Sequence, residues 1–134
     1  MNRLAILGCT GSIGTQTLDV VRSYPGEFSV AGLAAGYNID LLVKQIEEFS
    51  PKMISSQRPR EELVDHINEG CTIVSQEELA SSPSVDTVLA AGVGSSGLTP
   101  ILAAVRAGKT VLLVNKEPLV MAGELIMKEA ELHH

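Results

Sequence analysis

Short, continuous apolar runs alternate along the chain with longer segments in which apolar residues recur at helical spacing. Continuous runs such as Leu4–Leu7 are typical of parallel strands that are buried on both faces. Segments with the longer period, such as Ile39–Phe49, are typical of helices that pack on a core with one side. The pattern predicts strands at 4–7, 28–35, 53–54, 72–74, 85–90 and 110–114, and helices at 13–22, 39–49, 60–68, 76–80, 98–107 and from about 119 onward.

This order of strands and helices predicts an α/β fold. We expect a Rossmann-type, doubly wound and mainly parallel sheet with helices on both faces. The 134 residues fit one domain, spanning 1–134. Ligands on such sheets bind at the carboxyl ends of the strands. The loops after Leu7, Ala34, Ala90 and Val114 are therefore the candidate binding loops.

Composition and charge narrow the class of partner. Apolar residues make up 45% of the chain and charged residues 19%, which is typical of a globular protein. The net charge of −6 argues against nucleic acid as a partner. No apolar stretch approaches the roughly 18 residues of a membrane span, and no signal-peptide core is visible. Cys9 and Cys71 form neither a metal spacing nor a disulfide framework, so we expect a cytoplasmic protein without a membrane partner.

The first loop carries Gly8, Gly11 and Gly14 between a strand and a helix, which is where a dinucleotide-binding fingerprint must stand. Gly8 permits a tight turn, Gly11 a close approach of the pyrophosphate, and Gly14 close packing of helix on strand. Thr10 and Ser12 add hydroxyl donors beside a helix N-terminus. The alternative is a glycine-rich turn that binds nothing. A Walker-type phosphate loop is excluded because no Lys-Ser or Lys-Thr pair follows.

The second loop indicates which dinucleotide would bind. The stretch 34–38 has no carboxylate where NAD-binding folds hold the ribose 2′-hydroxyl, so NADP is favoured over NAD. Gly36 permits close approach of a 2′-phosphate, Tyr37 offers a ring to the adenine, and Asn38 begins a helix whose N–H groups point at the phosphate. A helix cap without a ligand is the alternative. The loop itself holds no cation, and the basic residues that follow it are Lys44, Arg58 and Arg60.

Two further loops are rich in small or polar residues. The segment 91–97 is dense in glycine and serine, which favours close contact with the ribose and nicotinamide over a merely flexible connection. Asn115, Lys116 and Glu117 follow a core strand. Lys116 can neutralise an anionic substrate or stabilise an oxyanion, while Asn115 and Glu117 can bind the cofactor or orient Lys116. The alternative is a solvated turn with a local Lys–Glu pair.

Other chemistry is not indicated. The chain has no Tyr-x-x-x-Lys sequence, which disfavours a short-chain dehydrogenase. We interpret Cys9 as a small packed residue, Cys71 as a core residue and His66 as a surface residue. No Asp, Glu or His group has metal-ligand spacing, so neither a catalytic residue nor a metal ligand is predicted within the chain.

Four blocks together resemble the 1-deoxy-D-xylulose 5-phosphate reductoisomerase family. Gly8–Gly14 with Thr17–Val21 looks like the opening of these enzymes. The blocks Gly36–Asn38, Gly92–Leu98 and Ala107–Thr110 leading into Asn115–Glu117 agree in order and spacing. The resemblance extends along essentially the whole chain and is more specific than any one glycine motif.

The resemblance implies an NADPH-dependent oxidoreductase of non-mevalonate isoprenoid biosynthesis. Such enzymes isomerise 1-deoxy-D-xylulose 5-phosphate and reduce the product to 2-C-methyl-D-erythritol 4-phosphate, need Mg²⁺ or Mn²⁺, and are usually homodimers. Lys116 would contact the phosphorylated sugar substrate. The residues that would contact NADPH are Thr10, Gly11, Ser12, Ile13, Gly36, Tyr37, Asn38, Asn115 and Glu117.

Two departures from the family pattern qualify these expectations. Tyr37 stands where the family often has Lys or Arg, so the preference for NADP over NAD is expected to be weaker. The family's metal-binding carboxylates and substrate-phosphate residues lie beyond His134, and the helical pattern continues to the last residue. We therefore expect a part of a longer protein that binds the cofactor without turning over substrate.

Two other functions stay open at the level of sequence. A dehydrogenase of the glucose-fructose oxidoreductase type also places a lysine near the end of its fifth strand, but in Glu-Lys-Pro order rather than the Lys116-Glu117-Pro118 order found here. A non-catalytic module that binds a nucleotide or coenzyme A also uses a glycine-rich first loop, but it would leave the Asn-Lys-Glu cluster without a role.

Overall fold

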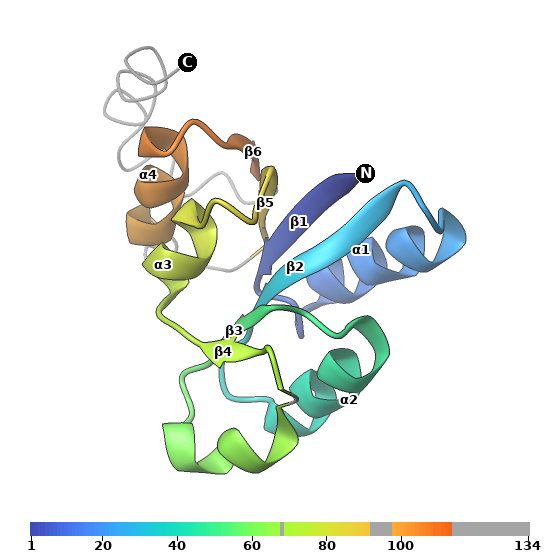
Figure 1. Cartoon of the computed structure of the whole chain (residues 1–134), viewed down its shortest axis with the longest axis vertical. Coiled ribbons are helices and arrows are strands. Elements are labelled where there is room, and N and C mark those ends of the chain that lie inside the picture. Colours follow the sequence, from blue (N-terminus) through green and yellow to red (C-terminus); the bar gives the residue numbers. More distant parts are fainter. Residues whose placement is uncertain (68, 92–97, 114–134) are drawn as a thin grey trace.

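The protein, seen in a computed structural model that describes residues 1–67, 69–91 and 98–113, is built on a parallel six-stranded sheet (Figure 1). The strands lie in the order β4-β3-β2-β1-β5-β6, and every neighbouring pair is parallel. This confirms the predicted Rossmann-type α/β fold. The strands are β1 (Asn2–Leu7), β2 (Phe28–Ala34), β3 (Met53–Ser55), β4 (Thr72–Ile73), β5 (Thr87–Ala90) and β6 (Thr110–Leu113).

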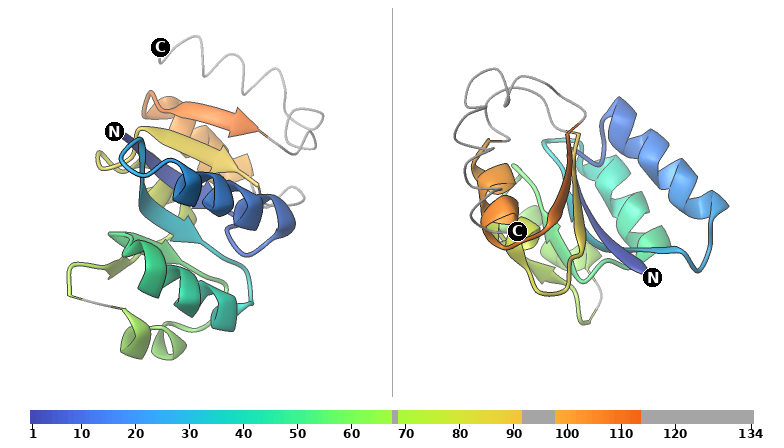
Figure 2. Two further views of the ribbon diagram at one scale, coloured as in Figure 1. Left: turned by 90° about the vertical axis from the view of Figure 1, so that its right-hand side faces the viewer. Right: turned by 90° about the horizontal axis from the view of Figure 1, so that it is seen from above.

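Helices cover both faces of the sheet (Figure 2). One face carries α1 (Ser12–Ser23) and α2 (Ile39–Phe49), and the other carries α3 (Gln76–Ser81) and α4 (Leu98–Arg106). Each face has its own apolar core, and β1 contributes to both because its side chains alternate: Leu4 and Ile6 to the first, Ala5 and Leu7 to the second. The core is therefore two layers that share one sheet.

An irregularity in β2 sets which of its side chains meet which layer. Leu4 pairs with Val30 and Ala5 with Gly32, so one residue of β2 is extra in the ladder. Beyond this point the alternation resumes with Leu33 in the first layer and Ala34 in the second. A Cβ on Gly32 would lie 2.8 Å from the side chain of Leu79 on α3, so the missing side chain lets α3 pack directly on the strand.

The helix predicted at 60–68 is wrong over its described part. The chain instead forms two short 3₁₀ turns, η1 (Arg60–Glu62) and η2 (Val64–His66), and is extended at Ile67. Among these described residues only Leu63 is fully buried, and Ile67 is partly buried against the same core layer. One buried side chain gives too little apolar stripe to hold an α-helix of several turns. The predicted helix from about 119 lies outside the described residues.

An ion pair fixes the position of β1 against β5 near the start of both strands. The Arg3 guanidinium donates to both carboxylate oxygens of Asp86 at 3.0 and 2.9 Å, and the Arg3 backbone N–H donates to Oδ2 at 2.9 Å. The hydrogen bond from the Arg3 side chain is the main reason that the pKa of the Asp86 carboxyl lies well below its ordinary value. Arg3 and Asp86 therefore form a fixed link across the central strands.

A second polar link joins the two helices on the first face. The Arg22 guanidinium, near the end of α1, pairs with Glu48 on α2 and with Asp19 on its own helix. It also lies over the Phe49 ring, 5.2 Å from the ring centroid. Hydrogen bonding to Arg22 is the main cause that lowers the pKa of Glu48. These contacts hold the C-terminal ends of α1 and α2 together.

Candidate dinucleotide site

The topology places a crevice between the loops that follow β1 and β5. Within the strand order, β2 lies next to β1 on one side and β5 lies next to β1 on the other. From β1 the chain passes through α1 to β2, away from β5. Loops that leave neighbouring strands in opposite directions open a ligand crevice at their carboxyl ends. The Ala91 N–H donates to the Leu7 carbonyl at 2.8 Å, so the loop after β5 starts directly beside the glycine loop after β1.

The glycine loop is held by backbone hydrogen bonds. The N–H groups of Gly8 and Cys9 both donate to the Ala34 carbonyl, at 2.8 and 3.0 Å. Gly8 has φ +84°, a left-handed conformation that favours glycine. The Gly11 N–H then donates to the Gly8 carbonyl at 3.2 Å and closes the turn. The tight turn predicted at Gly8 is therefore confirmed.

Gly11 and Gly14 differ in what the fold asks of them. A Cβ on Gly14 would lie 2.2 Å from the Gly8 carbonyl oxygen and 2.7 Å from the Cys9 Cα, so only glycine fits. The close packing predicted there is confirmed. A Cβ on Gly11 would lie 3.5 Å from the same oxygen, an ordinary contact. The fold does not require glycine at 11, which is consistent with a position kept open for a ligand.

The N-terminus of α1 presents its first turn without a side-chain cap. Gly11 is the N-cap residue, its backbone is extended, and no side chain there accepts a hydrogen bond from the helix. Thr15 Oγ1 donates to the Ser12 carbonyl at 2.9 Å and so leaves the N–H groups uncovered. Ser12 is exposed, and Ile13 is 41% exposed despite its apolar side chain. Uncapped N–H groups at the positive end of a helix form an anion site.

A buried glutamine, which the sequence analysis does not predict, holds the glycine loop through a hydrogen bond. Gln45 on α2 is only 3% exposed, and its Nε2 donates to the Cys9 carbonyl at 2.9 Å. Its Oε1 is buried without a hydrogen-bond partner within the described residues. Gln45 fixes the glycine loop to the helix that begins at the second loop. The only sequence feature that marks it is a polar residue between Leu42 and Ile46 on the apolar side of α2.

Cys9 is packed beneath the glycine loop and is not a nucleophile. Its side chain is fully buried, and burial raises the pKa of the thiol to about 12. Because the thiolate is the reactive form, such a cysteine is inert at neutral pH. Cys71 is partly buried against the first core layer, and His66 is exposed, as interpreted from the sequence.

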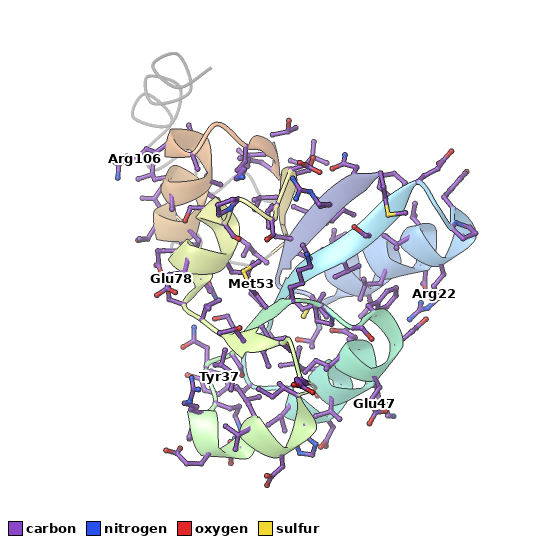
Figure 3. All side chains as sticks on the ribbon, in the orientation of Figure 1. Arg22, Tyr37, Glu47, Met53, Glu78 and Arg106 are labelled. Atoms are coloured by element: carbon purple, nitrogen blue, oxygen red, sulfur yellow. The ribbon has the colours of Figure 1, made fainter. Side chains whose placement is uncertain are left out.

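The second loop presents an exposed ring beside a helix N-terminus. Tyr37 is 70% exposed, and in Figure 3 it lies on the opposite side of the molecule from Arg22. Asn38 Oδ1 accepts a hydrogen bond from the Leu41 N–H at 3.2 Å and caps α2, as expected. A Cβ on Gly36 would meet no atom within 4 Å. The space over Gly36 is open, as a close approach of a phosphate would need.

A third loop, which the sequence did not single out, is attached to the second. After β3, Ser56 Oγ donates to the Gly36 carbonyl at 2.9 Å, and the Gln57 N–H donates to the same oxygen at 3.0 Å. The Arg58 N–H donates to Ser56 Oγ at 3.0 Å. The backbone around Arg58 therefore lies against Gly36 at the carboxyl edge of the sheet.

The structure brings the first two sets of predicted cofactor residues to one edge of the sheet. Thr10–Ile13 follow β1 and Gly36–Asn38 follow β2, its hydrogen-bonded neighbour. Asn115, Lys116 and Glu117, and the segment 92–97, lie outside the described residues. Within the described ranges, no group of three metal-ligating side chains is present and no helix is long and apolar enough to cross a membrane.

Comparisons with known proteins agree on one family. The family model for 1-deoxy-D-xylulose 5-phosphate reductoisomerase matches residues 4–123. The enzyme of that name from Geotalea uraniireducens is 46% identical over 99% of this chain, which covers 36% of the relative. The chain thus spans only about a third of the length of the curated relatives it matches.

Solved structures give the same result. A DOX-P reductoisomerase in complex with NADPH, fosmidomycin and magnesium superimposes with a TM-score of 0.91 at 40% identity, over 99% of this chain and 35% of that one. The Zymomonas mobilis 1-deoxy-D-xylulose 5-phosphate reductoisomerase in complex with NADPH gives a TM-score of 0.85 at 32% identity, over 98% of this chain and 36% of that one. The fold, the glycine loop and the sequence match together favour this family over the glucose-fructose oxidoreductase type and over a non-catalytic module. The chain belongs to the 1-deoxy-D-xylulose 5-phosphate reductoisomerase family.

Proposed function

We propose that this chain is the NADPH-binding domain of a 1-deoxy-D-xylulose 5-phosphate reductoisomerase. The observation that carries the proposal is the uncapped N-terminus of α1, reached through a glycine turn at the point where the strand order reverses, between β1 and β5. An anionic pyrophosphate fits that position because the N–H groups of the first turn need acceptors. Relatives of the same family are described in complex with NADPH.

The residues of the two described loops fit the dinucleotide. Thr10, Gly11, Ser12 and Ile13 would surround the pyrophosphate, with Gly11 giving the room that a Cβ would take. At the adenosine end, Gly36 leaves open space, Tyr37 offers an exposed ring and Asn38 starts a helix. The lack of a carboxylate at 34–38 allows a 2′-phosphate at this end. Asn115 and Glu117 would complete the cofactor contacts, and Lys116 would contact the substrate.

In the whole enzyme, NADPH held by these two loops would supply the hydride that reduces the aldehyde formed from the sugar phosphate, giving 2-C-methyl-D-erythritol 4-phosphate. The share of the curated relatives that this chain spans supports a division of labour, with this domain holding the cofactor. The ligands of Mg²⁺ or Mn²⁺ and the substrate-phosphate site would lie outside these 134 residues. We therefore expect no turnover from this chain alone.

The setting of the whole enzyme follows from the same proposal. It would act as a cytoplasmic homodimer on a phosphorylated sugar, with neither nucleic acid nor a membrane as a partner. The two free cysteines and the net charge of −6 support a reducing compartment and a small-molecule partner.

The test is titration of the purified chain with NADPH and with NADH, followed by nicotinamide fluorescence. We expect saturable binding of both, with tighter binding of NADPH because the second loop has no carboxylate, which would hold the ribose 2′-hydroxyl of NADH and repel a 2′-phosphate. Addition of 1-deoxy-D-xylulose 5-phosphate and Mn²⁺ should not oxidise NADPH. Absence of binding up to millimolar cofactor would refute the proposal, and metal-dependent turnover by these 134 residues would refute the division of labour.

A further inference from the structure

We propose that Arg58 is the cation that recognises the 2′-phosphate of NADPH and thereby sets the preference for NADP over NAD. The inference rests on the proposed function and names a residue within the same site. The second loop itself lacks a cation for the 2′-phosphate, since Gly36, Tyr37 and Asn38 carry no charge with which to bind a phosphate dianion.

The backbone geometry places Arg58 beside the loop that would hold the 2′-phosphate. Two hydrogen bonds to the Gly36 carbonyl, from Ser56 Oγ at 2.9 Å and the Gln57 N–H at 3.0 Å, attach the loop after β3 to the loop after β2. The Arg58 N–H donates to the same Ser56 hydroxyl. Arg58 is therefore one short step from Gly36, the position whose missing side chain leaves open space.

The side chain of Arg58 is already oriented by an ion pair. Its Nε lies 2.8 Å from Glu62 Oε2, and its Nη2 donates to Glu62 Oε1 at 3.2 Å. The side chain is 39% exposed, so the guanidinium is partly buried yet reachable. Because Glu62 contacts Nε and Nη2, a phosphate would be bound through the Nη1–Nη2 end of the guanidinium. A forked guanidinium is the group that binds phosphate in two-point fashion.

The other two basic residues that follow the second loop, Lys44 and Arg60, are less well placed to reach a 2′-phosphate. Lys44 lines a hollow together with Thr15 and Asp19 of α1, so it faces the neighbouring helix rather than the second loop. Arg60 begins η1 two residues further along and is exposed. The Arg60 carbonyl accepts a hydrogen bond from the Leu63 N–H, within its own 3₁₀ turn, and within the described residues no hydrogen bond connects Arg60 to Gly36. Of these three cations, Arg58 is thus the one whose backbone is hydrogen-bonded, through Ser56, to the second loop.

The experiment compares three variants of the purified chain by titration with NADPH and with NADH, which differ only in the 2′-phosphate. Arg58→Gln should weaken NADPH binding about tenfold or more, because a charge-assisted hydrogen bond is lost, and should leave NADH binding within about twofold. Arg60→Gln, a matched loss of charge, should change neither. Glu62→Gln frees the guanidinium from its competitor and should keep or strengthen NADPH binding.

The Glu62 variant separates recognition from a structural role. If Arg58 served only to hold η1 through its ion pair, Arg58→Gln and Glu62→Gln would break the same contact and behave alike. Equal losses in the two variants, or equal losses of NADPH and NADH in Arg58→Gln, would overturn the inference. So would equal binding of the two cofactors by the unaltered chain, which leaves dinucleotide binding intact, whereas binding of neither cofactor defeats the proposed function itself.

Discussion

Among single residues, Gly11 and Gly14 stand three positions apart in the same loop and serve different purposes. At Gly14, α1 packs directly on the turn, and the Gly8 carbonyl and the Cys9 backbone occupy the space that a side chain would need. Gly11 faces no such neighbour. Gly14 is therefore required for folding, whereas the fold leaves the space beside Gly11 available for a ligand.

The first prediction compares Gly14→Ala with Gly11→Ala. The added Cβ at 14 would lie 2.2 Å from a backbone oxygen, so the free energy of unfolding should fall by about 1–3 kcal/mol or more. At 11 the change should stay within about 1 kcal/mol, the usual range for an N-cap change. NADPH binding, by contrast, should weaken about tenfold in Gly11→Ala as the pyrophosphate is pushed from the N–H groups. Urea unfolding by far-UV circular dichroism and cofactor titration measure the two quantities.

The opposite pattern would contradict this assignment. If Gly11→Ala unfolded more readily than Gly14→Ala, or bound NADPH unchanged, the open space at Gly11 would have no connection with a ligand. Gly26→Ala provides a control for the method. Gly26 has φ +89° in a turn far from the site, so this variant should be less stable but should bind NADPH unchanged when folded.

At the residue scale, the sequence predicts positions better than partners. The turn at Gly8, the packing at Gly14 and the cap at Asn38 follow from backbone requirements that leave a local trace. Gln45 could not be predicted, because its partner is a backbone carbonyl 36 positions away in the chain. Lys116 and its neighbours remain predictions, since they lie outside the described residues.

At the scale of elements, the Arg3–Asp86 pair holds together the two strands on whose loops the crevice depends. Asp86 immediately precedes β5, and its backbone carbonyl also accepts a hydrogen bond from the Thr110 N–H at the start of β6. The side chain thus joins β5 to β1, and the main chain joins it to β6. A shift of β5 against β1 would move the loops that follow both strands.

The second prediction follows from the lowered pKa of Asp86. A carboxyl whose pKa is lower in the folded than in the unfolded chain stabilises the fold above its ordinary pKa, near 3.8, and loses this contribution as the pH falls toward the folded value. Asp86→Asn should therefore be less stable than the unaltered protein at neutral pH, with a difference that shrinks in acid. Urea unfolding at a series of pH values from 7 downward measures it.

The partner variant checks the cause. Arg3→Gln removes the group that lowers the pKa of Asp86, so it should abolish the same part of the pH dependence. A constant difference between Asp86→Asn and the unaltered protein across the whole pH range would mean that the pair adds no stability through ionisation. Because both side chains are exposed, added salt should reduce the effect.

Elements were predictable where apolar runs were long and unambiguous. The six strands of the described residues stand within one or two residues of their predicted bounds, and the buried part of β1, Leu4–Leu7, is a continuous apolar run. A helix is predicted after Pro59 from the spacing of its apolar residues, but the fold fully buries only Leu63 of the described part and forms two 3₁₀ turns there. Apolar spacing is a weak guide where few of the spaced residues reach the core.

Over the whole molecule, stability comes from two apolar layers on the two faces of one sheet. The first layer includes Ile6 and the second includes Ile101, both almost completely buried. Neither layer can form without the strands between them. We therefore expect the described fold to unfold as one cooperative unit.

The third prediction compares Ile6→Ala and Ile101→Ala, the same truncation on opposite faces. Each should lower the free energy of unfolding by about 2–5 kcal/mol through lost burial and the cavity left behind. The loss at 101 should be slightly smaller, since alanine favours the helix there by some tenths of a kcal/mol. Each variant should keep a single transition in urea when followed by circular dichroism and by tyrosine emission. Two separated transitions in either variant would show that the layers fold independently.

The exposed ring at the carboxyl edge has an optical consequence. The chain contains no tryptophan and two tyrosines, so its intrinsic emission comes from Tyr24 and Tyr37. Tyr24 stands at the end of α1, away from the glycine loop at its beginning, and Tyr37 stands where an adenine would stack. Changing Tyr24 to phenylalanine would leave one emitter, located in the second loop, so that quenching by a stacked base would report the arrival of the adenine separately from that of the nicotinamide. Tyr37 would thus serve as an intrinsic fluorescent probe for the adenine half of the proposed ligand.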